Sequence, residues 1–177
     1  FCPGFYELGS RKFHCWLKGG HGKLTLQEAI QKSCDVYFYE LARKVGIKRI
    51  GAMARILGLG QSYNLPLTGL SKGFVPTKKW KKERFGTSWL VGDTLNVGIG
   101  QGFSLATPLQ LAVMTARLAS GKNVTPNLIR SPNKDPEEPK DLSIRKSTLV
   151  SIRKGMFDVL NDKDGTAYKS RSTNENF

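Results

Sequence analysis

The side chains best suited to chemistry lie close together near the start of the sequence. All three cysteines and both histidines fall within the first 34 residues: Cys2, His14, Cys15, His21 and Cys34. Cys34 is also the centre of Ser33-Cys34-Asp35, which adds a hydroxyl and a carboxylate that are candidates for acid–base chemistry. Any chemistry that these side chains perform is therefore located in this region.

Cys2, Cys15, His21 and Cys34 together could supply a tetrahedral Cys3His zinc site, with His14 as the alternative nitrogen ligand. The intervening segments hold twelve, five and twelve residues, more than the roughly two to four of a zinc-finger knuckle. A glycine-rich loop with little core, however, needs an additional link to hold it. The alternatives are a disulfide between Cys2 and Cys15 with Cys34 buried and free, as an oxidising compartment would permit, or three free thiols. The spacing leaves all three open.

A helix must position the serine and the aspartate. Thr25-Leu26-Gln27-Glu28 is a capping box that begins this helix, apolar residues then recur every three or four positions, and Gly46 ends it. On an unbroken helix, Ser33 and Asp35 would point about 200° apart and could not face one cleft. If both serve one site, the helix must break between them at Cys34, and Asp35 then becomes a candidate N-cap for a second helix.

The rest of the chain predicts mostly helices. We expect a compact loop or hairpin over residues 1–24 and amphipathic helices over 47–57 and from 143 or 145 to 160. We also expect a basic helix over 78–84, a short extended stretch at 95–97 and a buried, strongly apolar helix over 109–119. Residues 121–142 read as a surface loop with at most one strand, at 124–129, and 164–167 as a turn.

The length and composition indicate one globular domain but do not identify what it binds. The 177 residues suit one domain, and the formal charge of +14 with a pI near 9.9 is compatible with nucleic acid, an anionic membrane surface or a polyanionic setting. No run of about 18 apolar residues occurs, and the start of the chain resembles no signal peptide and lacks Met. We therefore expect the chain to be a fragment of something longer.

A series of short motifs resembles the class B penicillin-binding proteins and, among them, the elongation-specific peptidoglycan D,D-transpeptidase. The matching pieces are Cys2-Pro3-Gly4, Gly20-His21-Gly22, residues 33–39, residues 89–94, residues 98–102, residues 107–110 and Gly165-Thr166-Ala167. The resemblance implies an α+β serine transpeptidase (β-lactamase/penicillin-binding-protein-like) fold, represented here by a mostly α-helical fragment. Residues 1–177 would be part of one transpeptidase domain.

This family uses three catalytic motifs: Ser-x-x-Lys with the nucleophile, Ser-x-Asn, and Lys-Ser/Thr-Gly. The second is matched here by Ser33-Cys34-Asp35, with Asp in place of Asn, and no Ser-x-x-Lys lies upstream of it. The resemblance implies that Ser33 relays a proton between the lysine of the first motif and the leaving nitrogen. Asp35 would contact that lysine or the substrate amide, although an ionised carboxylate cannot donate a hydrogen bond as Asn can. We expect the fragment alone to be inactive.

The resemblance also implies the surroundings of the parent enzyme. Its substrates would be peptidoglycan stem peptides, its inhibitors β-lactams, its partners membrane proteins of the elongation complex, and its location the periplasmic face of the bacterial inner membrane. The four ligands named above are similar to a metal site reported among elongation-specific transpeptidases, so we expect structural zinc. We also expect the fragment to associate through the apolar face of the 109–119 helix.

Two rival interpretations belong to other classes. One is a zinc-stapled structural or nucleic-acid-binding module, in which Lys78 to Arg84 contacts phosphates and Trp80 stacks on bases. A charge run is more often a solvated face, and we expect no nucleic-acid partner. The other is a scaffold fragment that binds proteins of the elongation complex. Gly98-Ile99-Gly100-Gln101-Gly102 lacks the context of a dinucleotide fingerprint, so we interpret it as backbone geometry beside the active cleft.

Overall fold

The computed structural model describes residues 1–129 and 138–171. The chain begins with an antiparallel hairpin of β1 (Phe5–Leu8) and β2 (Arg11–His14), as the sequence predicts for residues 1–24. The buried ring of Phe13 packs edge-on against Tyr39, with ring centroids 5.7 Å apart. The hairpin is thereby fixed against the helices rather than standing alone.

The predicted break in the first helical segment is confirmed. Helix α1 (Leu26–Gln31) begins with the expected capping box, in which the Thr25 amide donates to Glu28 Oε2 at 2.7 Å. Helix α2 (Asp35–Val45) follows after three residues and ends at Gly46. The N-cap of α2 is Cys34 and not Asp35, so that detail of the prediction is wrong by one position. Asp35 is instead the first residue of the helix.

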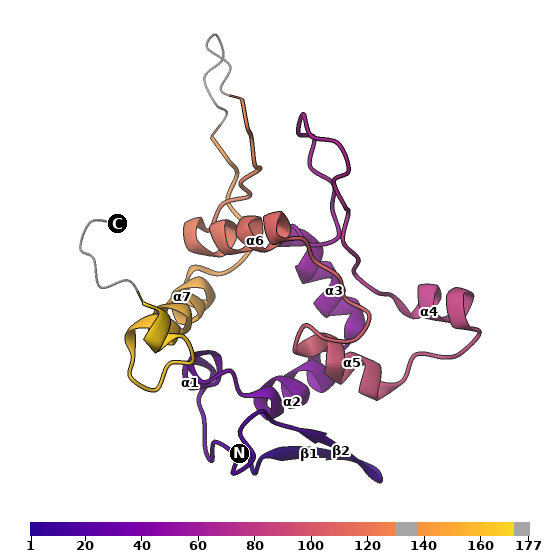
Figure 1. Ribbon diagram of the computed structural model, residues 1–177, viewed down its shortest axis with the longest axis vertical. Coiled ribbons are helices and arrows are strands. Elements are labelled where there is room, and N and C mark those ends of the chain that lie inside the picture. The colour runs from indigo at the N-terminus through magenta and orange to yellow at the C-terminus, as the bar shows by residue number, and fades with distance from the viewer. Residues whose placement is uncertain (130–137, 172–177) are drawn as a thin grey trace.

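The remaining helices complete a ring that Figure 1 shows face-on. Their bounds are α3 (Ile47–Ile56), α4 (Lys78–Phe85), α5 (Val91–Gly98), α6 (Pro108–Ser120), α7 (Lys146–Asn161) and the 3-10 helix η1 (Tyr168–Ser170). Helix α1 packs on α7, α7 on α6, and α2 on both α3 and α5, while α4 lies outside this ring (Figure 1). The arrangement places α1, the first helix of the chain, against α7 (Figure 1).

Helix α5 corrects one expectation, because residues 95–97 are helical and not extended. Thr94, Leu95 and Val97 are buried on its inner face, and Trp89 Nε1 donates to Thr94 Oγ1 at 2.8 Å. A Cβ at Gly98 would lie 2.3 Å from Ala42 Cβ of α2. Glycine at position 98 is therefore required for the close contact between α5 and α2.

Helix α6 follows the N-cap Thr107, which forms a capping box with Gln110, but it is not the buried, strongly apolar helix that the sequence predicted. Its buried residues include two polar ones, Gln110 and Arg117, whereas Leu111 is 46% exposed. Arg117 donates through Nε to the Val124 carbonyl at 3.0 Å and through Nη1 to the Ile56 carbonyl at 2.7 Å. Association through this helix stays a prediction.

The described residues of the 121–142 segment form no strand at 124–129, which agrees with the prediction of at most one. The Val124 carbonyl accepts from Arg117, and the two ends of the segment meet at an isolated bridge between Lys122 and Asp141 and at an ion pair between Lys122 and Glu138. Residues 130–137 of the predicted loop lie outside the described residues.

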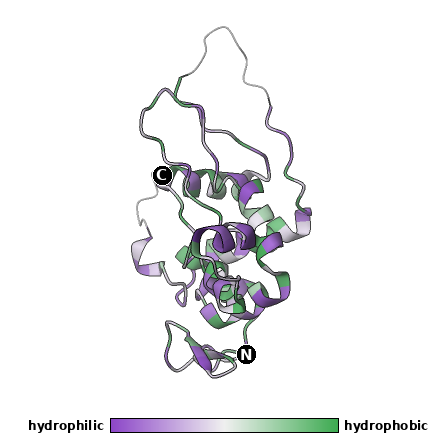
Figure 2. Ribbon diagram, turned by 90° about the vertical axis from the view of Figure 1, so that its right-hand side faces the viewer, coloured by the Kyte–Doolittle hydropathy of each residue, from purple (hydrophilic) through white to green (hydrophobic). Residues whose placement is uncertain are grey.

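The main core lies between the hairpin and helices α1, α2 and α5, close to the N-terminus. Its buried members are Cys2, Phe13, Cys15, Ala29, Cys34, Val36, Tyr39 and Leu95. Figure 2 shows this end of the molecule from the side, with the hairpin below the helices. All three cysteines thus belong to the core that holds the hairpin in place.

Within the described ranges, no helix combines the length and apolar character needed to cross a bilayer.

Candidate functional site

The break between α1 and α2 gives Ser33 an unusual backbone. Its φ of 49° is the only positive value among the described residues other than glycine. Such a conformation is strained for a residue with a Cβ and is held by its surroundings. Cys34 then returns to an extended conformation, and its amide donates to the Ala29 carbonyl at 3.0 Å. As a result Ser33 is exposed while the Cys34 side chain is fully buried.

The Ser33 hydroxyl meets the C-terminal part of the chain. Its Oγ lies 3.1 Å from Thr166 Oγ1, and the Thr166 amide donates to the Gln31 carbonyl at 3.2 Å. Lys32 Nζ forms an ion pair with Asp164 Oδ2 at 3.1 Å. The sequence predicted the turn that carries Thr166, but gave no local signal that its hydroxyl would contact Ser33 across 133 positions.

Asp35 is held by the N-terminal loop instead. Its Oδ2 accepts a hydrogen bond from the Trp16 amide at 2.8 Å, and the Trp16 indole donates to the Lys32 carbonyl at 3.0 Å. The carboxylate also lies in the first turn of α2, where the helix dipole favours negative charge. The two candidate catalytic residues are therefore tied to different parts of the chain.

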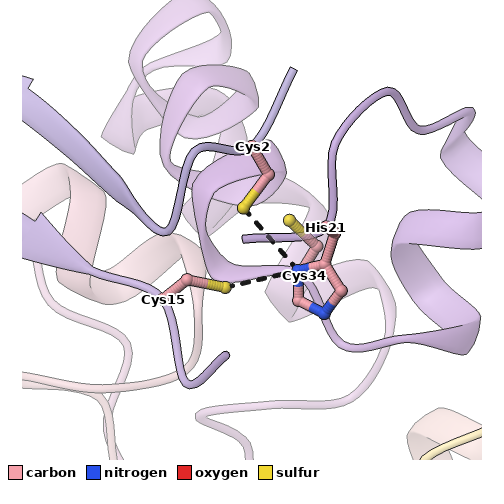
Figure 3. Close-up of side chains that lie close together, drawn as sticks. All are labelled: Cys2, Cys15, His21 and Cys34. Atoms are coloured by element: carbon pink, nitrogen blue, oxygen red, sulfur yellow. Dashed lines mark hydrogen bonds between the residues drawn. The ribbon is translucent and has the colours of Figure 1, made fainter. Parts of the chain in front are cut away.

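The four predicted metal ligands come together as one cluster, shown in Figure 3. Their ligand atoms all lie within 4.8 Å of one another, and His21 Nδ1 is 3.6 Å from Cys2 Sγ and 3.5 Å from Cys15 Sγ. His14, the alternative ligand, is exposed on β2 and takes no part. All three thiols are free, so the Cys2 to Cys15 disulfide is not formed.

Two separations within this cluster are those expected for tetrahedral coordination of a zinc ion. With Zn–S bonds of about 2.3 Å and a Zn–N bond of about 2.0 Å, tetrahedral coordination separates the nitrogen from each sulfur by about 3.5 Å. The two measured separations, 3.5 and 3.6 Å, match that value. The opposite ring nitrogen, His21 Nε2, is buried and has no hydrogen-bond partner among the described residues.

Backbone hydrogen bonds close the loop around the cluster. Cys2 and Gly22 exchange two backbone hydrogen bonds of 2.7 and 3.0 Å, and the Cys15 amide donates to the Gly4 carbonyl at 2.8 Å. Gly20 has a φ of 75°, and a Cβ there would lie 2.2 Å from the Cys2 carbonyl oxygen. Only glycine therefore allows this loop to bring its ligands to Cys34.

Burial and nearby charge set the protonation of these ligands. Burial raises the pKa of the Cys34 thiol to about 12, which keeps it protonated when no cation is near. Burial also acts to raise the pKa of Cys2, but backbone hydrogen bonds from His21 and Gly4 outweigh it and lower that pKa overall. Burial, with the charge of Lys32, lowers the pKa of His21, so the ring is neutral and able to ligate.

The basic segment of α4 is not a uniform solvated face. Lys81 is buried and pairs with Asp93 Oδ2 at 2.5 Å. The Trp80 ring packs against Phe74 and Phe103, with centroids 4.5 and 5.3 Å away. Because Trp80 is engaged inside the protein, the structure does not offer it as a platform for stacking bases.

Comparison with known proteins places these features in a family. Residues 1–175 match the family described as Penicillin binding protein transpeptidase domain. The chain is 35% identical over 181 residues to the peptidoglycan D,D-transpeptidase MrdA of Haemophilus influenzae and 34% identical over 180 residues to that of Escherichia coli. Each alignment covers 96% of this chain but only 28% of the relative.

The solved structures that resemble this chain belong to the same family as the relatives found by sequence. The penicillin-binding protein PBP2 of Helicobacter pylori superposes with a TM-score of 0.89 and 42% identity, over 98% of this chain and 33% of that one. PBP2 of Pseudomonas aeruginosa gives a TM-score of 0.87 with 37% identity, over 96% of this chain and 39% of that one. The expected serine transpeptidase fold is confirmed, and the chain belongs to the penicillin-binding protein transpeptidase domain family.

Proposed function

We propose that this chain forms part of an elongation-specific peptidoglycan D,D-transpeptidase, which crosslinks stem peptides through a serine acyl-enzyme and is acylated by β-lactams. The observation that carries the proposal is the family match over residues 1–175, together with the exposed Ser33 hydroxyl held at the helix break. The relatives named as peptidoglycan D,D-transpeptidase support the reaction class. The nucleophile would come from the rest of the parent protein.

Ser33 would act as the proton relay of that reaction. Acyl transfer needs a base to accept the proton of the attacking serine and an acid to protonate the leaving amine. A hydroxyl can do the second by giving its own proton to the amine while it receives another from the lysine of the Ser-x-x-Lys motif, so that its protonation state is restored. Exposure of Ser33 on the surface of this part of the fold is compatible with that role.

Asp35 would work by position and charge. Because its Oδ2 already accepts the Trp16 amide, the carboxylate holds the N-terminal loop next to the Ser33 turn. We propose that the same carboxylate contacts the lysine ammonium of the first motif, which an ionised acceptor favours over a substrate amide carbonyl. This assigns Asp35 the first of its two expected contacts.

We also propose that Cys2, Cys15, His21 and Cys34 hold a structural zinc ion. The short separations from His21 Nδ1 to two sulfurs support it, because this nitrogen and these sulfurs are atoms that would bind the ion. Bound zinc would supply charge that keeps the thiols deprotonated and would link the hairpin, the glycine-rich loop and α2. The cluster would thereby stabilise the break that presents Ser33.

The proposed surroundings follow from the relatives. The H. pylori PBP2 has also been solved in a complex with MreC, and this chain resembles that PBP2 with 41% identity. We propose a comparable membrane-associated partner and a periplasmic location for the parent, with β-lactams as inhibitors. No specific observation favours the nucleic-acid-binding alternative.

The test is acylation of the full-length protein by a fluorescent penicillin, followed by peptide mapping, with the isolated chain as control. The proposal expects label on a serine outside residues 1–177 and none on the isolated chain. It also expects Ser33→Ala to slow acylation of the full-length protein by at least about 100-fold, as for loss of a general acid or base. A folded protein that takes up no penicillin would contradict the proposed activity.

A further inference from the structure

The contact between Ser33 and Thr166 joins two hydroxyls that lie far apart in the sequence. Ser33 is at the break before α2, and Thr166 is in the turn that follows α7. Their oxygens are 3.1 Å apart, and either hydroxyl could be the donor. Thr166 therefore has a direct contact with the side chain to which the proposed proton relay is assigned.

The turn that carries Thr166 is fixed rigidly at several points. A Cβ at Gly165 would lie 2.3 Å from the Val159 carbonyl oxygen, so the turn can approach α7 this closely only with glycine there. The amide of Ala167, two residues after Gly165, donates to the same Val159 carbonyl at 3.1 Å. Together with the Thr166 amide bond to Gln31, these contacts fix the Thr166 backbone relative to both α7 and the end of α1.

Ser33 itself needs such a partner. Its left-handed backbone is supported by surrounding contacts, and an exposed serine would otherwise sample its three χ1 rotamers. A hydrogen bond to a fixed hydroxyl selects one of these rotamers. If Thr166 donates, the proton of Ser33 remains free to point toward a reacting group, and the electron density on Ser33 Oγ is stabilised as that proton leaves.

We propose that Thr166 is a positioning residue for Ser33, an inference that rests on the proposed relay function of that serine. Thr166 gains and loses no proton in the reaction; it orients Ser33 Oγ and donates a hydrogen bond to it. The Lys32 to Asp164 ion pair holds the same two segments together from the exposed side.

The experiment measures acylation of the full-length protein by a penicillin in stopped-flow, which separates the noncovalent dissociation constant from the first-order acylation rate. The variants are Thr166→Val, which keeps the shape and removes the hydroxyl, and Thr166→Ser, which keeps the hydroxyl. Thr115→Val is the matched control, because it removes a threonine hydroxyl bonded to the Leu111 carbonyl on α6 at 3.0 Å. Ser33→Ala and thermal unfolding are measured in parallel.

We expect Thr166→Val to lower the acylation rate about tenfold, as loss of one hydrogen bond to a developing charge would, with the dissociation constant unchanged. Thr166→Ser should recover most of the rate, and Thr115→Val should match the parent. An unchanged rate in Thr166→Val, with Ser33→Ala strongly impaired, would overturn the positioning role and leave the proposed function standing. An unimpaired Ser33→Ala would overturn both. A parallel fall in rate and melting temperature without rescue by serine would show a purely structural role and would also overturn the proposal.

Discussion

The ion pair between Lys81 and Asp93 offers a measure of how buried charge holds α4 against α5. The two side chains are only 9% and 16% exposed, and Asp93 Oδ2 also accepts the Leu90 amide at 2.7 Å. The Lys81 ammonium lies over the Trp89 and Phe103 rings, 6.0 and 5.6 Å from their centroids. Lys81→Met would keep the aliphatic packing and leave the Asp93 carboxylate buried without its countercharge.

Removing one partner of a buried pair costs about 3 to 5 kcal/mol, because the remaining charge is desolvated and unpaired. For a domain of this size, about 2 to 4 °C of melting temperature are lost per kcal/mol. We therefore expect Lys81→Met to lower the melting temperature by roughly 6 to 20 °C. Differential scanning calorimetry of the purified protein measures this directly.

Two control variants separate charge from packing. The double variant Lys81→Met with Asp93→Asn removes both charges and keeps an acceptor for Leu90, so it should recover to within about 1 kcal/mol of the parent. Lys44→Met breaks the pair with Glu40, whose side chains are 71% and 44% exposed, and should cost less than about 0.5 kcal/mol. A double variant as unstable as Lys81→Met would refute the reasoning, since the loss would then come from packing and not from unpaired charge.

Three further predictions concern the metal, the turn after α7 and the first helix. The purified protein should hold about one equivalent of zinc, and Cys34→Ser should lose it, as measured by elemental analysis; well under one equivalent in metal-replete protein would remove the zinc proposal. Gly165→Ala should destabilise the fold by more than about 2 kcal/mol in denaturant unfolding, because its Cβ would meet the Val159 carbonyl at 2.3 Å. The backbone and side-chain hydrogen bonds of Thr25 lower the pKa of Glu28, so their contribution to stability is present above the usual glutamate pKa and is lost as pH falls through the lowered folded value. Glu28→Gln should therefore flatten the dependence of stability on pH below about 5, and an unchanged profile would contradict the assignment.

Local signals in the sequence predicted much of the fold. The capping residues Thr25 and Thr107 define helix starts through bonds to residues three positions away, and Gly46 marks a helix end, so each is readable from a few neighbouring letters. The helix break at Cys34 followed from a geometric requirement on its two neighbours. The cluster of Cys2, Cys15, His21 and Cys34 was predictable because only a few cysteines and histidines exist to choose from, and the structure brings these four side chains together.

The failures arose where a partner distant in the sequence decides the outcome. Gly92 and Gly98 suggested tight backbone features around an extended stretch, but both lie in α5, where a Cβ at Gly98 would collide with Ala42 of α2, a contact that no short window reveals. The many apolar residues of α6 predicted that this helix is buried. Its buried residues include Arg117, however, which donates hydrogen bonds to backbone carbonyls of two other segments. The sequence marked Thr166 as part of a turn and of a family motif, but not as the partner of Ser33, because the two residues are 133 positions apart.

The contacts of Ser33 and Asp35 at the helix break form at different times while the chain is synthesised. Asp35 is fixed by Trp16, only 19 positions earlier, whereas Ser33 is fixed by a residue emerging 133 positions later. During synthesis from the N-terminus, the aspartate can therefore be in place long before the serine. A nascent chain that stops before residue 162 should protect the Trp16 amide from hydrogen exchange while the Ser33 hydroxyl lacks its Thr166 partner. The Ser33 hydroxyl would thus gain its Thr166 partner only after that residue has left the ribosome, long after the contact between Trp16 and Asp35 can form.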